Sequence, residues 1–164
     1  MKSRVRNIVV VTMTCLFIAG CDDTYISSIP DYPVSLQLNL YVNPYNTIKE
    51  NPNHYLIFDS KSPNYGGIYA IGYGGVLVYC GFDYNYYAFD LSCPYEHKQE
   101  IKVKPNDLGQ AVCEKCGTVF DIGYGVGNPS KRIRPNLPDT TALAKEVLKR
   151  YRTSMQNNYL YITR

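Results

Sequence analysis

Two cysteine-bearing loops constrain what this chain can fold into more than any other feature. They are residues 91–97, Leu-Ser-Cys-Pro-Tyr-Glu-His, and residues 112–121, Val-Cys-Glu-Lys-Cys-Gly-Thr-Val-Phe-Asp. Together they carry three thiols and one imidazole in the spacing Cys-x3-His-x15-Cys-x2-Cys. Two such loops can bring four ligands onto one metal ion in a small β-rich domain. The candidate metal ligands are therefore Cys93, His97, Cys113 and Cys116.

The first 20 residues have the pattern of an export signal. Three basic residues precede an apolar stretch from Ile8 to Ala19, and the run Ile18-Ala19-Gly20-Cys21 ends it. This ending resembles the bacterial lipoprotein box, which implies that residues 1–20 are removed and that Cys21 carries fatty acyl groups such as palmitate. The alternative, a membrane-spanning anchor, would need about 20 apolar residues. We expect a lipid-anchored protein exported to the periplasmic face or the cell surface.

Charge and length limit the class of protein. Of 17 basic residues, three lie in the signal, which leaves 14 against 14 acidic residues in a nearly neutral mature chain. With no basic tract, the sequence does not predict a nucleic-acid partner. We expect a tether over residues 21–33 and a single domain over 34–164. Export exposes the remaining thiols to oxidation, so a disulfide is the main rival to a metal.

The hydrophobic pattern predicts an all-β domain. Residues 34–42 alternate strictly between apolar and polar side chains, as in a half-buried strand. Short runs rich in β-branched and aromatic residues follow, separated by glycine- and asparagine-rich turns, which is typical of a small sandwich or barrel. Asp139 and the pattern after it predict a short helix over 140–150. A hairpin is expected to follow, with Asn157-Asn158 as its turn. The expected short strands are 55–58, 68–71, 76–79, 86–89, 101–103 and 118–122.

Residues from about 34 to the end resemble a Rieske iron–sulfur domain. Gly75-Val76-Leu77-Val78-Tyr79, followed by Ala88-Phe89 and Cys93-Pro94, is similar to the strand pair that enters the family's first cluster loop. The run from Cys113 through Gly117-Thr118-Val119-Phe120-Asp121 is similar to the family's second loop. The resemblance implies a Rieske-like fold of short antiparallel strands with two ligand-loop hairpins.

The ligand set departs from that family at two positions. Cys93 and Cys113 match the family's cysteines, but Tyr95 and Cys116 stand where its two histidines belong. Imidazole ligands raise the potential of a Rieske centre, and this set does not reproduce that centre. Three outcomes stay open: a single zinc or iron ion, a 2Fe-2S cluster on three thiolates and His97, or a metal-free disulfide.

These outcomes define two functions. One is a metal or iron–sulfur protein that passes electrons to a redox partner at the membrane surface. The other is a binding or scaffold lipoprotein that has kept the fold and lost the metal. No hydrolase or transferase motif is visible, so an enzyme acting alone is not expected. Cys80, at the end of a predicted strand, is interpreted as a buried apolar residue.

Overall fold

The computed structural model describes residues 27–63, 66–132 and 146–164, which fold almost entirely into antiparallel strands. Within these ranges the helical element is a short 3-10 helix, Tyr45–Ile48. The all-β prediction is confirmed. The strands are β1 (Val34–Asn39), β2 (Tyr55–Phe58), β3 (Ile68–Ile71), β4 (Val76–Cys80), β5 (Tyr86–Asp90), β6 (Val103–Pro105), β7 (Gln110–Cys113), β8 (Thr118–Asp121), β9 (Asn128–Arg132), β10 (Arg150–Gln156) and β11 (Tyr159–Thr163).

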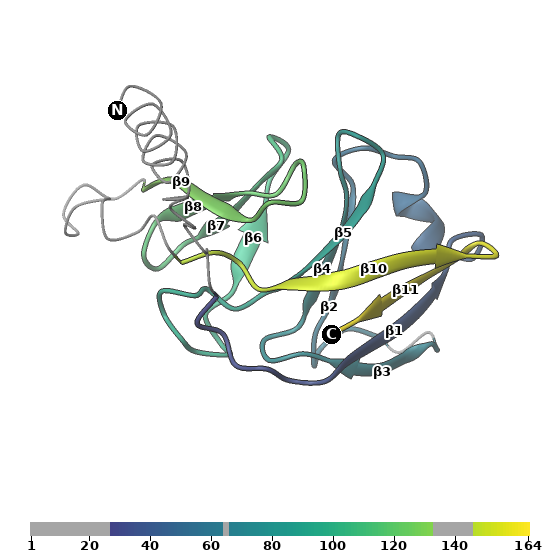
Figure 1. Cartoon of the computed structure of the whole chain (residues 1–164), viewed down its shortest axis with the longest axis horizontal. Coiled ribbons are helices and arrows are strands. Elements are labelled where there is room, and N and C mark those ends of the chain that lie inside the picture. The colour runs from purple at the N-terminus through teal and green to yellow at the C-terminus, as the bar shows by residue number, and fades with distance from the viewer. Residues whose placement is uncertain (1–26, 64–65, 133–145) are drawn as a thin grey trace, which may run out of the picture.

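The strands form two sheets of unequal size. The larger has seven strands in the order β2-β4-β5-β10-β11-β1-β3, and the smaller has four in the order β6-β7-β8-β9. In Figure 1 the large sheet curves so that β2 and β4 run behind β10, and the small sheet lies beside one end of it. Within the described ranges, no helix is both long and apolar enough to cross a bilayer.

Strands β4 and β5 form a wall between two hydrophobic cores. All five residues of β4 are buried, because its two faces pack against different cores. Val76, Val78 and Cys80 face the core enclosed by the large sheet. Leu77 and Tyr79 face a second core, which also contains Cys93, Cys113 and Cys116 and is completed by the small sheet. Successive side chains of a strand point to opposite faces, so one strand serves both cores.

The C-terminal hairpin matches its prediction, whereas the described end of the helix predicted before it does not. Asn157 and Asn158 have φ values of 47° and 67°, and they turn β10 into β11. Positive φ at both central residues is what a tight type I′ turn requires, and asparagine tolerates it. Most of the predicted helix lies outside the described residues. Its described end, residues 146–150, is not helical: Val147 to Lys149 have no regular secondary structure, and β10 begins at Arg150.

Two strands were not expected from the sequence. They are β7 and β9, the second of which contains Pro129, and a bulge between Val119 and Phe120 accommodates the pairing of β9 with β8. The strand expected over 101–103 begins later, as β6 at Val103. These differences all fall in the small sheet, whose strands have three to five residues each.

Candidate metal centre

The first cysteine loop leaves the wall strand β5 and is closed at its base by backbone hydrogen bonds. Ser92 forms an isolated antiparallel bridge with Lys102. The amide of Cys93 donates to the carbonyl oxygen of Ile101 at 2.9 Å. The carbonyl oxygen of Cys93 in turn accepts the amide of His97 at 3.2 Å. We call residues 93–97 the first knuckle.

A buried carboxylate fixes the start of this loop. Asp90 is fully buried and accepts backbone hydrogen bonds from Tyr73 at 2.9 Å, Gly74 at 3.1 Å and Ser92 at 2.8 Å. The hydroxyl of Tyr151 donates to it at 2.6 Å. Burial, together with the negative charge of Asp90, raises the pKa of Tyr151. A buried carboxylate is tolerated only when hydrogen bonds satisfy it, and four donors do so here.

The second cysteine loop is a tight turn between two adjacent strands. Cys113 ends β7, and Cys116 lies two residues before β8 begins at Thr118. The amide of Gly117 donates to the carbonyl oxygen of Cys113 at 2.8 Å. Gly117 has a φ of 73°, a left-handed conformation that glycine adopts without steric cost. We call residues 113–117 the second knuckle.

The two knuckles bring three sulfur atoms together. The Sγ atoms of Cys93, Cys113 and Cys116 all lie within 4.8 Å of one another. Those of Cys93 and Cys116 are 3.7 Å apart. All three side chains are buried, and all three are free thiols. The hydroxyl of Thr118 lies 3.1 Å from the Sγ of Cys116 and can donate to a thiolate there.

The three thiols share their protons as one unit. Hydrogen bonds from Cys113 and Cys93 lower the pKa of Cys116. The same contacts raise the pKa of Cys113, through Cys116, and that of Cys93, through Cys113 and Cys116. One thiolate is therefore stabilised by its two neighbours, while a second and third are opposed by like charge and burial. A cation between the sulfurs would remove that opposition.

The structure does not bring His97 to the sulfur atoms. His97 is exposed, and it is not among the described metal-ligand groups within 4.8 Å of the three thiols. Its φ of 51° shows that it serves the turn of the first knuckle. Tyr95 is half-buried against the cysteine-containing core, with its ring centroid 6.3 Å from that of Phe120. Cys80 lies on the other face of β4, in the large-sheet core, where burial raises the pKa of its thiol.

The donor set fits one metal ion and does not fit a Rieske cluster. Tetrahedral zinc with Zn–S bonds of about 2.3 Å separates its sulfur ligands by about 3.8 Å. The measured 3.7 Å between Cys93 and Cys116 agrees with that separation. A Rieske cluster needs two imidazoles on one iron. The chain has only two histidines, His54 and His97, and both are exposed. His54 lies on the large-sheet side, where its carbonyl oxygen accepts the amide of Cys80, and so it does not belong to the thiol cluster.

The N-terminal segment packs onto the first knuckle. The hydroxyl of Ser28 donates to the carbonyl oxygen of Pro94 at 2.9 Å. Ile29 is 2% exposed, and Asp31 forms ion pairs with Lys149 and Arg164. Residues 27–31, which belong to the predicted tether, therefore contact the domain. The predicted signal (1–20) and the lipidation residue Cys21 lie outside the described residues.

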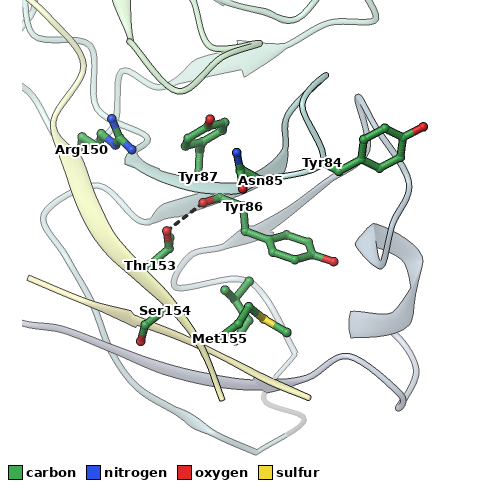
Figure 2. A pocket seen from close by; sticks show the side chains of 9 residues that line it. Tyr84, Asn85, Tyr86, Tyr87, Arg150, Thr153, Ser154 and Met155 are labelled. Atoms are coloured by element: carbon green, nitrogen blue, oxygen red, sulfur yellow. Dashed lines mark hydrogen bonds between the residues drawn. The ribbon is translucent and has the colours of Figure 1, made fainter. Parts of the chain in front are cut away.

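A groove away from the thiols lies between β5 and β10 (Figure 2). The two strands pair at one end, where Arg150 lies opposite Phe89 and Tyr151 opposite Ala88. Farther along, the hydroxyl of Thr153 donates to the carbonyl oxygen of Tyr86 at 2.8 Å. The groove has a volume of about 510 Å³. No cysteine, histidine or carboxylate lines it, so it lacks the commonest metal ligands. Its lining is Tyr84, Asn85, Tyr86, Tyr87, Arg150, Thr153, Ser154, Met155 and Leu160.

Comparison with known proteins leaves the family open. The chain matches no family model and no curated protein. Among solved structures, it is similar to a chain from the complex of reduced oxygenase and oxidized ferredoxin in carbazole 1,9a-dioxygenase. That match has a TM-score of 0.38 and 14% sequence identity, and covers 69% of this chain and 82% of that chain. A likeness this weak carries no argument, so function is argued from this chain's own residues.

Proposed function

We propose that this protein binds one metal ion, zinc or iron, between its two knuckles through Cys93, Cys113 and Cys116. The observation that carries the proposal is the convergence of three buried sulfur atoms within 4.8 Å. In a two-iron cluster each iron takes two protein ligands, so three thiolates would be divided between two irons. Three sulfurs around one point instead suit a single tetrahedral ion.

The bound ion would cross-link the small sheet to the wall strand. Cys93 follows β5, whereas Cys113 and Cys116 belong to the β7–β8 turn. An ion that binds only the folded state stabilises that state, by an amount that grows with the logarithm of the metal affinity. Zinc would give a structural site, and iron would add one-electron chemistry with a redox partner protein.

Metal analysis of the full chain, purified without oxygen, tests this proposal. We expect one zinc or iron per chain, no acid-labile sulfide, and three thiols that react with a thiol reagent only after the metal is removed. Replacement Cys116→Ser should reduce the stoichiometry to well below one. Sulfide with two irons per chain would contradict the single-ion proposal.

A disulfide is the rival at the same site. The Cys93 and Cys116 sulfur atoms are already 3.7 Å apart, and a modest movement would bring them to bonding distance. An absence of metal together with two lost thiols, in protein purified from its native compartment, would favour this clamp and the scaffold function.

We also propose that Cys21 is lipidated after removal of residues 1–20, which anchors the protein to a bacterial membrane. The support is the run Ile18-Ala19-Gly20-Cys21 after an apolar stretch. Mass spectrometry of the N-terminal peptide should find acyl groups on Cys21. Replacement Cys21→Ser should release the protein from the membrane fraction or block its processing, and an unmodified Cys21 in membrane-bound protein would contradict the proposal.

A further inference from the structure

The two knuckles have the same backbone arrangement. In each, the carbonyl oxygen of the leading cysteine accepts the amide of the residue four positions later: His97 to Cys93 at 3.2 Å, and Gly117 to Cys113 at 2.8 Å. In each, that later residue is left-handed, with φ of 51° at His97 and 73° at Gly117. Position by position, residues 93–97 therefore correspond to residues 113–117.

This correspondence assigns different roles to two neighbouring residues. His97 corresponds to Gly117, whose role is to turn the backbone. Glu96 corresponds to Cys116, which presents its sulfur to the thiol cluster. The side chain of Glu96 is only 15% exposed, although it is charged. Its partner is Lys115, which belongs to the second knuckle, so the Glu96 carboxylate already reaches across to the opposite loop.

We propose that the carboxylate of Glu96 is the fourth ligand of the metal site, and that Lys115 competes with the ion for it. The inference rests on the proposed function. A carboxylate oxygen is an accepted ligand for zinc and for iron. Among the described residues, the group of donor atoms within 4.8 Å contains only the three sulfurs, so the Glu96 side chain must rotate away from Lys115 to bind. A glutamate side chain has three rotatable bonds, and the rotation would exchange its ion pair with Lys115 for a bond to the metal.

Cobalt(II) is a suitable probe because its visible spectrum reports the number and type of its ligands. We expect Glu96→Gln, in the full chain, to weaken Co(II) binding at least about tenfold, the lower end of the loss when a partner of a metal site is removed. The ligand-field bands should shift as well. Two matched controls should leave both readouts unchanged: Glu114→Gln in the other knuckle, and His97→Asn, which keeps a residue type that tolerates left-handed backbone.

Two further variants test the geometry and the competition. Glu96→Cys should add a thiolate and strengthen the sulfur-to-cobalt charge-transfer band, whereas His97→Cys should not. Lys115→Met should tighten Co(II) binding by severalfold, because Glu96 is then unpaired before the ion binds. In the Glu96→Gln background the Lys115→Met change should have a clearly smaller effect, because only the interaction of Lys115 with the thiolates and the ion remains. The difference between the two backgrounds in this double-mutant cycle measures the coupling with Glu96, and equal effects would contradict the competition.

The outcomes separate this inference from the proposed function. If the unmodified chain binds no Co(II), the metal proposal fails. If it binds Co(II) and Glu96→Gln changes neither affinity nor spectrum, the site stands and the role of Glu96 is wrong. A spectral change on His97→Asn would assign the fourth position to imidazole. The ¹¹³Cd chemical shift of the unmodified protein checks the result without any variant, since it distinguishes three sulfurs and one oxygen from other donor sets.

Discussion

The first and second knuckles adopt the same backbone conformation, but different interactions stabilise it in each. The second is a local turn between β7 and β8, with glycine at its left-handed position. The first is part of a longer loop, with histidine at that position, and it depends on Asp90 and Ser28 from outside the knuckle. A metal-ligand turn can therefore be encoded locally or held by distant contacts. The two knuckles should respond differently when each kind of support is removed.

Loss of the buried carboxylate should have the largest effect. Replacement Asp90→Asn keeps the shape but leaves fewer acceptors for three backbone amides and the Tyr151 hydroxyl. We expect the free energy of unfolding to fall by about 2–3 kcal/mol, as for hydrogen bonds to a buried charge. Urea denaturation of the metal-free chain measures this.

Tyr151→Phe is the matched control for Asp90→Asn. It removes one of the four donors and should cost about 1–2 kcal/mol. Hydrogen exchange should show faster exchange at Cys93 and His97 in Asp90→Asn, with little change at Gly117. Equal effects on the two knuckles would contradict the distinction between local and distant support.

Substitution of Gly117 or His97, the two residues with left-handed backbone, should lower stability by less than Asp90→Asn does. Gly117→Ala places a side chain at φ 73° and should lower stability by about 1–2 kcal/mol. His97→Gly removes the steric cost of a side chain at positive φ but increases the conformational freedom of the unfolded chain. The two effects oppose each other, so the free energy of unfolding should change by less than about 1 kcal/mol. Thermal denaturation of both variants measures the difference. A large loss of stability in His97→Gly would mean that position 97 contributes to stability through the His97 side chain rather than through its backbone conformation.

The smallest expected effect concerns the ion pairs beside the knuckles. Lys102, at the base of the first loop, pairs with the half-buried Asp59 at 2.7 Å. Lys104 of β6 and Glu114 of the second knuckle form an exposed pair. The hydrogen bond from Lys102 lowers the pKa of Asp59 from 3.8 to about 2. Its contribution is therefore complete above pH 3.8 and is lost as the pH falls toward 2.

Asp59→Asn should cost up to about 1 kcal/mol at neutral pH, and Glu114→Gln should cost less. The difference between Asp59→Asn and the unmodified chain should disappear between about pH 4 and pH 2, where Asp59 itself becomes protonated. Urea denaturation of both proteins across that pH range measures whether the stability difference shrinks as the pH falls. A difference that persists at pH 2 would assign the effect of the variant to packing instead.

The large sheet was predictable because its signals are local. The strict alternation after Val34 and the Asn157-Asn158 turn each specify their element within a few residues, and β1 and the β10–β11 hairpin lie where they were expected. The small sheet was less predictable. Its strands β7 and β9 have few β-branched residues, and the pairing of β9 with β8 contains Pro129 and a register shift. Tertiary contacts decide such short strands.

The candidate site was predictable in part. The spacing pointed to both cysteine loops, and the structure places the sulfurs of Cys93, Cys113 and Cys116 together. The ligand role of His97 stays a prediction that its exposed position does not support. The proposed role of Glu96 follows from the left-handed backbone of His97, which the sequence pattern does not predict. Asp90 was also missed, because its donors come from segments distant in the sequence.

The contact between Ser28 and Pro94 limits how far the sulfur atoms can rise above a bilayer. Seven peptide steps separate Cys21 from Ser28, and a fully extended chain covers at most about 25 Å over that span. If Cys21 carries acyl chains, the first knuckle must stay close to the lipid headgroups. A protein that delivers metal or electrons to this end would then meet it within about 25 Å of the membrane surface.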